Sequence, residues 1–82
     1  MQTKALIVDD EPDILELLDI TLNRMNIGCD CAANLDEARK YLNDNTYSLC
    51  LTDMNLPDGN GIELVTHIQK YFPDMPVAVL TA

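Results

Sequence analysis

The chain has 82 residues, which suits one small domain, and 48% of them are hydrophobic. Fourteen Asp and Glu against five Lys and Arg give a net charge of −9, so we expect no direct binding of nucleic acid phosphates. No apolar run approaches the roughly 20 residues of a membrane span, and no secretion signal is recognisable, which predicts a cytoplasmic protein without membrane contact.

Short apolar runs alternate with amphipathic stretches along the whole chain. This alternation is typical of βα repeats that build a parallel sheet, so we expect one α/β domain over residues 1–82. The predicted strands lie near residues 4–9, 28–32, 47–53 and 76–81, and the predicted helices near residues 13–25, 35–43 and 61–71.

The helical stretches carry apolar residues at helical spacing. In the first, acids and Pro12 favour the start of a helix, and Gly28 is predicted to supply the break after it. In the second, Asn34 and Glu37 have the spacing of a capping box. The expected buried faces consist of Ile14, Leu15, Leu17, Leu18, Leu22 and Met25, then Leu35, Ala38 and Leu42, then Ile62, Val65 and Ile68.

Two of the predicted strands end in acid, at Asp9 and Asp10 and again at Asp53. Parallel strands place their carboxyl ends at one edge of a sheet, where open α/β sheets bind ligands. Three carboxylates that meet there repel one another unless a cation is present. Oxygen ligands of this kind suit Mg²⁺, and a carboxylate beside Mg²⁺ can act as a nucleophile on a phosphoryl group.

The chain also contains a hydroxyl and a turn that fit this chemistry. Thr81 ends the last apolar run, where its hydroxyl could donate to a phosphoryl oxygen, and residues 55–61 form the densest turn signal, directly after Asp53. No Walker-type loop and no GxGxxG pattern is present, so the phosphoryl donor is expected to come from outside the chain.

Three segments carry a resemblance to a known family. Residues 6–12 (LIVDDEP), 51–61 (LTDMNLPDGNG) and 79–82 (VLTA) resemble, in order and spacing, the receiver domain of bacterial two-component response regulators. Residues 5–14 and 50–54 resemble more narrowly the receivers of sigma-54-dependent transcriptional activators, the class that includes a regulator of type IV pili.

The resemblance implies a flavodoxin-like sheet with strand order 2-1-3-4, as is known for this fold. It implies that Asp53 is the phosphoacceptor, that Asp10, Asp53 and the backbone carbonyl of Asn55 bind Mg²⁺ directly, and that Asp9 acts mainly through water. Thr81 would be the switch hydroxyl. The implied phosphoryl donor is the phosphohistidine of a sensor histidine kinase, and the implied output domain, which would activate transcription, lies outside this chain.

Receivers of this family continue with a further helix, a fifth strand that ends near an essential lysine, and a last helix, and these 82 residues do not contain them. The predicted last strand, residues 76–81, is then expected to be a sheet edge that could pair with a second copy and form a homodimer.

Two other functions are compatible with the sequence. One is an interaction domain that is not phosphorylated. The other is a phosphatase with an aspartate nucleophile, although such enzymes usually place a second acid two residues after the nucleophile, and Asn55 stands there in this chain. We expect a regulatory domain that catalyses at most its own phosphorylation and dephosphorylation.

Overall fold

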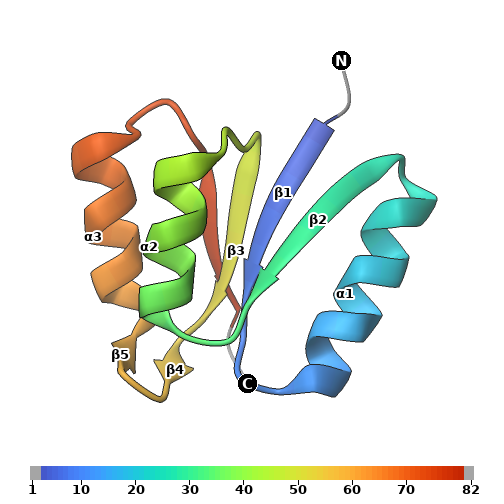
Figure 1. The fold of residues 1–82 in the computed structure, drawn as a ribbon, viewed down its shortest axis with the longest axis horizontal. Coiled ribbons are helices and arrows are strands. Elements are labelled where there is room, and N and C mark those ends of the chain that lie inside the picture. The colour runs from blue at the N-terminus through green and yellow to red at the C-terminus, as the bar shows by residue number, and fades with distance from the viewer. Residues whose placement is uncertain (1–2, 81–82) are drawn as a thin grey trace.

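A parallel sheet with helices on both faces forms the domain, as the computed structural model describes it over residues 3–80 (Figure 1). The elements are β1 (Thr3–Val8), α1 (Pro12–Arg24), β2 (Ile27–Ala32), α2 (Leu35–Asp44), β3 (Leu49–Asp53), β4 (Asn55–Leu56), β5 (Gly59–Asn60), α3 (Gly61–Tyr71) and β6 (Val77–Leu80). The main sheet has the order β2-β1-β3-β6, and its three strand pairs are all parallel. Because β6 is the fourth of the predicted strands, the predicted order 2-1-3-4 is confirmed.

The core lies between the sheet and the two helices α2 and α3, which stand side by side on one face (Figure 1). Every second residue of β1 points into it, and the helices contribute the apolar residues that recur at their spacing. Its fully buried members include Leu6, Val8, Cys50, Leu35, Ala38, Leu64 and Ile68. The predicted face of α2 is confirmed. In α3, Ile68 is buried as predicted and Val65 is half-buried, whereas Ile62 is 49% exposed and Leu64, which was not predicted, is fully buried.

Helix α1 lies alone on the other face of the sheet and contains no buried residue (Figure 1). Four residues of its predicted apolar face are half-buried, namely Ile14, Leu15, Leu18 and Leu22. Leu17 is 61% exposed and Met25 63% exposed, so the prediction is wrong at these two positions. The cause is geometric, since the described residues place no second helix beside α1 to cover its flanks.

Local signals explain where the helices begin and end. Pro12 stands in the first turn of α1, as predicted, but the chain leaves the helix at Asn26, whose φ of 62° is left-handed, and Gly28 lies inside β2. Asparagine is one of the few residues that tolerate this conformation after a helix. Asn34 caps α2 by accepting the Glu37 N–H at 2.8 Å. The Glu37 carboxylate accepts from the Ala33 N–H at 3.1 Å, one residue before the position expected of a capping box.

Candidate functional site

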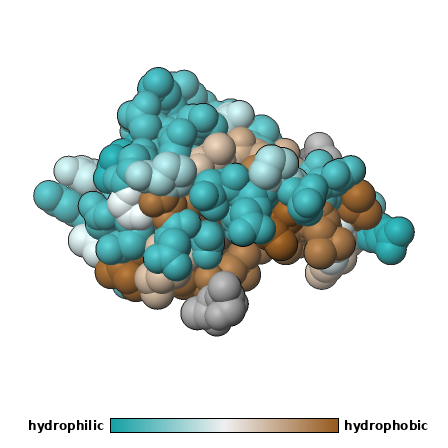
Figure 2. Space-filling view, turned by 90° about the horizontal axis from the view of Figure 1, so that it is seen from below, coloured by the Kyte–Doolittle hydropathy of each residue, from teal (hydrophilic) through white to brown (hydrophobic). Residues whose placement is uncertain are grey.

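The carboxyl ends of β1 and β3 bring the predicted acids together. The two strands are neighbours in parallel register, with Val8 opposite Thr52, so the positions that follow place Asp9 beside Asp53. Asp9, Asp10 and Asp53 each offer one carboxylate oxygen, and these three oxygens lie within 4.8 Å of one another. Figure 2 views the molecule from this edge and shows hydrophilic residues across the middle of the face.

The three carboxylates differ in burial and in their hydrogen bonds. Asp9 is only 5% exposed, and one of its oxygens accepts from the Glu11 N–H at 2.9 Å. Asp53 is half-buried, and its Oδ1 accepts from the Met54 N–H at 2.8 Å, while Asp10 is exposed. No Lys or Arg side chain forms a salt bridge with any of the three within residues 3–80. Their mutual repulsion is therefore not relieved by a neighbouring cation of the protein.

The donor set fits a small divalent cation. Oxygens around Mg²⁺ stand at most about 4.2 Å apart, twice the roughly 2.1 Å of a metal–oxygen bond. The observed oxygens are within 4.8 Å of one another, so a small side-chain adjustment would bring all three onto one ion. These residues offer only oxygen atoms, which Mg²⁺ prefers over nitrogen or sulfur.

The loop after Asp53 is folded into a small hairpin. Strand β4 pairs antiparallel with β5, so that Asn55 stands opposite Asn60, and the Gly61 N–H donates to the Met54 carbonyl at 2.7 Å. Asn55, two residues after Asp53 in the sequence, is therefore the first residue of this hairpin. Thr81, the fourth predicted site residue with a side-chain role, lies outside the described residues.

Two residues of this loop, Gly61 and Asp58, shape the site although the sequence did not predict a role for them. A Cβ at Gly61 would run into the backbone carbonyl of Asp53, so only glycine lets α3 begin this close to the end of β3. Asp58 accepts two backbone N–H groups from the start of α2, at Leu35 and Asp36. The sequence signal for Gly61 is a glycine at the first position of an amphipathic helix, whereas no local pattern marks the distant partners of Asp58.

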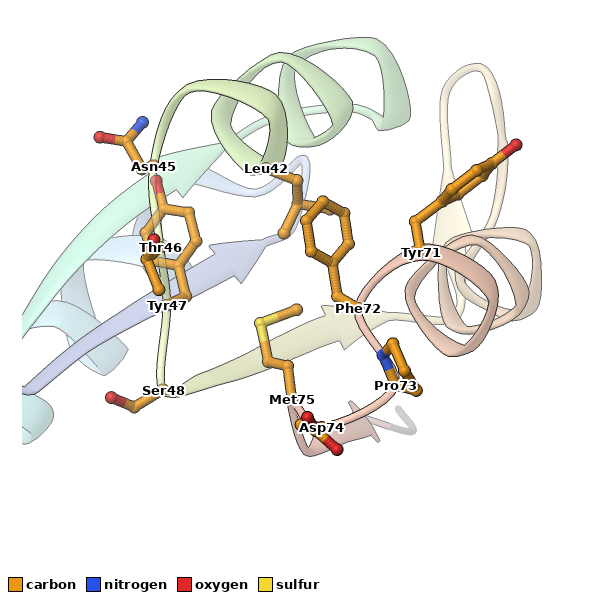
Figure 3. A pocket seen from close by; sticks show the side chains of 10 residues that line it. All are labelled: Leu42, Asn45, Thr46, Tyr47, Ser48, Tyr71, Phe72, Pro73, Asp74 and Met75. Atoms are coloured by element: carbon orange, nitrogen blue, oxygen red, sulfur yellow. The ribbon is translucent and has the colours of Figure 1, made fainter.

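A hollow lies at the opposite end of the strands, where β3 and β6 begin. A cavity of about 360 Å³ is lined by residues 45–48, which precede β3, and by residues 71–75, which precede β6. Figure 3 shows Leu42, Tyr47, Phe72 and Met75 around it, which makes its wall largely apolar. It is thus separated from the acids by the length of the strands.

No helix within residues 3–80 has both the length and the apolar character needed to cross a membrane.

Comparison with known proteins agrees with this geometry. Response regulator protein PilR of Pseudomonas aeruginosa is 58% identical over 79 residues, which are 96% of this chain but 18% of that protein. Response regulator protein TrrA of Thermotoga maritima, solved in complex with Mg²⁺-BeF, superposes with a TM-score of 0.93 at 36% identity, over 98% of this chain and 70% of that one.

A third relative extends the comparison to a modified protein. A response regulator protein of Burkholderia pseudomallei, solved with a phosphorylated aspartic acid, a calcium ion and citrate, superposes with a TM-score of 0.90 at 26% identity, over 96% of this chain and 46% of that one. The family model described as the response regulator receiver domain matches residues 5–82. The chain therefore belongs to the response regulator receiver domain family.

Proposed function

We propose that this chain is a phosphoacceptor signalling domain in which Asp53 receives a phosphoryl group in the presence of Mg²⁺. The observation that carries the proposal is the approach of three carboxylate oxygens, from Asp9, Asp10 and Asp53, to within 4.8 Å at the carboxyl ends of two parallel strands. The relatives solved with Mg²⁺-BeF and with a phosphorylated aspartic acid support it.

In this proposal each acid has its own role. Asp10, Asp53 and the backbone carbonyl of Asn55 hold Mg²⁺ directly, and Asp9 acts through water. The bound ion supplies neutralisation of the negative charge on the phosphoryl oxygens. The Met54 N–H orients the Asp53 carboxylate through Oδ1, and Thr81 donates its hydroxyl to the phosphoryl group as the switch residue.

The reaction is a transfer between two carriers. A carboxylate oxygen of Asp53 forms a bond to phosphorus while the bond from phosphorus to the donor nitrogen breaks, and the imidazole of the donor leaves with the electron pair. We propose a sensor histidine kinase as the donor. The domain then catalyses at most its own phosphorylation and dephosphorylation, and Asn55, which is neither acid nor base, argues against a general phosphatase.

The partners follow from the same proposal. We assign residues 1–82 to the N-terminal portion of one receiver domain. The chain spans 18% of the length of PilR and 70% of the TrrA chain. An output domain that activates transcription would lie outside this chain. Strand β6 pairs with β3 on one side only within the described residues, so we also propose that it can pair with a second copy.

The experiment is phosphorylation by a small acyl phosphate with Mg²⁺, followed by intact mass. It is carried out on this chain and on a version extended to the length of the solved receivers. We expect an adduct of one phosphoryl group, its absence in Asp53→Asn, and its persistence in Asp44→Asn, which removes an equal charge at the far end of α2. No adduct in the extended version would refute the proposal, and turnover of many phosphate esters would favour the phosphatase.

A metal titration tests the ligands separately from the transfer. Asp10→Ala removes one carboxylate and should weaken Mg²⁺ binding, whereas unchanged affinity would contradict the assignment of Asp10.

A further inference from the structure

Asp58 connects two parts of the molecule that are distant in sequence. Its Oδ1 accepts from the Leu35 N–H at 2.8 Å, and its Oδ2 accepts from the Asp36 N–H at 3.1 Å. Both donors belong to the first turn of α2, more than twenty residues earlier in the chain. The carboxylate thus bridges the tip of the hairpin β4–β5 and the start of α2.

The bridge completes the N-terminal cap of α2. The first N–H groups of a helix have no partner inside the helix. Asn34 satisfies the N–H of Glu37, and Asp58 satisfies those of Leu35 and Asp36. Since the negative carboxylate also lies at the positive end of the helix dipole, the contact is favourable in charge as well as in geometry.

The hairpin needs such an anchor because it has few others. Its two strands have two residues each, and Asn55, Gly59 and Asn60 are exposed. Leu56 is the one residue of β4 and β5 that is buried. Close packing holds the same turn against α2, since a Cβ at Gly59 would collide with the Leu35 side chain.

We propose that Asp58 is a positioning residue for the metal site, because its two hydrogen bonds to α2 fix the hairpin that carries the Asn55 carbonyl. This inference rests on the proposed function, in which that carbonyl is a ligand of Mg²⁺. Asp58 acts through the loop and touches neither the ion nor the phosphoryl group. Its role requires a carboxylate, because both oxygens accept from backbone N–H groups.

Asparagine cannot replace this carboxylate. The amide of Asp58→Asn keeps one oxygen acceptor, and its NH₂ group would face a backbone N–H, so that two donors oppose each other. Asp58→Glu keeps both acceptors on a longer side chain. Asp36→Asn is the matched control, because it removes one negative charge from the same turn of α2 but leaves the Asp36 N–H and the bridge in place.

The experiment compares these variants in the full chain by two readouts. Titration with Mg²⁺ alone should show a loss of affinity of about 10-fold in Asp58→Asn, the size found when a residue that supports a metal ligand is removed. Asp58→Glu should recover most of it, and Asp36→Asn should bind as the wild type does. Amide hydrogen exchange in metal-free protein should be faster at Gly61, whose N–H closes the loop, in Asp58→Asn only.

The outcomes separate this inference from the proposed function. Equal affinity and equal Gly61 exchange in Asp58→Asn and the wild type would overturn the positioning role and leave the proposed function standing. An equal loss in Asp36→Asn would also overturn it, since charge alone would then be the cause. If the wild type bound no Mg²⁺, the proposed metal site would fail and the positioning role toward it would fall as well, while faster Gly61 exchange would still show the tether.

Discussion

At the scale of single residues, a polar network beside the core stabilises the partly buried carboxylate of Asp30 through Tyr47 and Lys4. The Tyr47 hydroxyl donates to Asp30 Oδ2 at 2.6 Å, and the Lys4 ammonium lies 2.8 Å from the same oxygen. Tyr47 is buried, so its hydroxyl needs this partner. Burial alone would raise the pKa of Asp30, but the hydrogen bonds from Lys4 and Tyr47 outweigh it and lower that pKa.

This network should make stability depend on pH in acid. Because the folded-state pKa of Asp30 lies below its ordinary value of 3.8, the unfolded chain binds more protons there. The stabilisation is present above the unfolded pKa and disappears as the pH falls through the folded pKa. We expect the urea midpoint of the wild type to fall more steeply below about pH 4 than that of Asp30→Asn.

Tyr47→Phe provides the intermediate case for that measurement. It removes the hydroxyl and leaves Lys4 in place, so its slope against pH should lie between those of the wild type and Asp30→Asn. Equal slopes for all three proteins would show that Asp30 is not the group responsible.

Single residues also show what the sequence could predict about the site. Asp9, Asp10 and Asp53 were predictable as neighbours, because the ends of adjacent parallel strands must meet whatever the details of packing. Asp58 was not, since its partners at Leu35 and Asp36 become neighbours only after the whole sheet has formed. The closeness of Gly61 to the Asp53 carbonyl depends likewise on where α3 comes to lie.

At the scale of elements, each strand or helix could be predicted as well as its local sequence signal was strong. The predicted strands and helices all exist in the described residues, and their bounds there differ from the predicted ones by at most two residues. The hairpin of β4 and β5 could not be predicted because strands of two residues have no recognisable alternation. The predicted burial of Leu17 and Met25 in α1 was wrong, because periodicity gives the direction of an apolar face, whereas its burial depends on neighbouring elements.

Helix α3 depends on the capping box at its start. The Asn60 side chain accepts from the Glu63 N–H at 3.1 Å, and the Glu63 carboxylate accepts from the Asn60 N–H at 2.9 Å. Asn60→Ala removes the first of these bonds and should lower the free energy of unfolding by about 1 kcal/mol, measured by urea denaturation.

The control for this prediction is the same substitution inside a helix. Asn43 is exposed within α2, where alanine is the better helix former. Asn43→Ala should therefore raise the free energy of unfolding by roughly 0.5 kcal/mol. Two substitutions of identical chemistry would then act in opposite directions. A loss of similar size at both positions would contradict the role of Asn60 as a cap.

At the scale of the whole molecule, the open side of the sheet and the net charge oppose each other. Strand β6 stands at the edge of the sheet within the described residues, and Ala78 on it is exposed. Unpaired backbone groups at such an edge favour pairing with another strand. The net charge of −9 acts against this pairing, because two copies repel each other.

We therefore expect a dimer whose fraction rises with protein concentration and with salt in sedimentation, since salt screens repulsion beyond about 10 Å at 0.1 M. Ala78→Lys places a charge on the edge strand and should abolish the dimer. Thr66→Lys, at an exposed position of α3, makes the same change in net charge outside the edge strand. Because either lysine reduces the net negative charge, electrostatics alone would favour the dimer in both variants. Loss in Ala78→Lys together with a gain in Thr66→Lys would thus locate the interface at β6, and parallel behaviour of the two would exclude it.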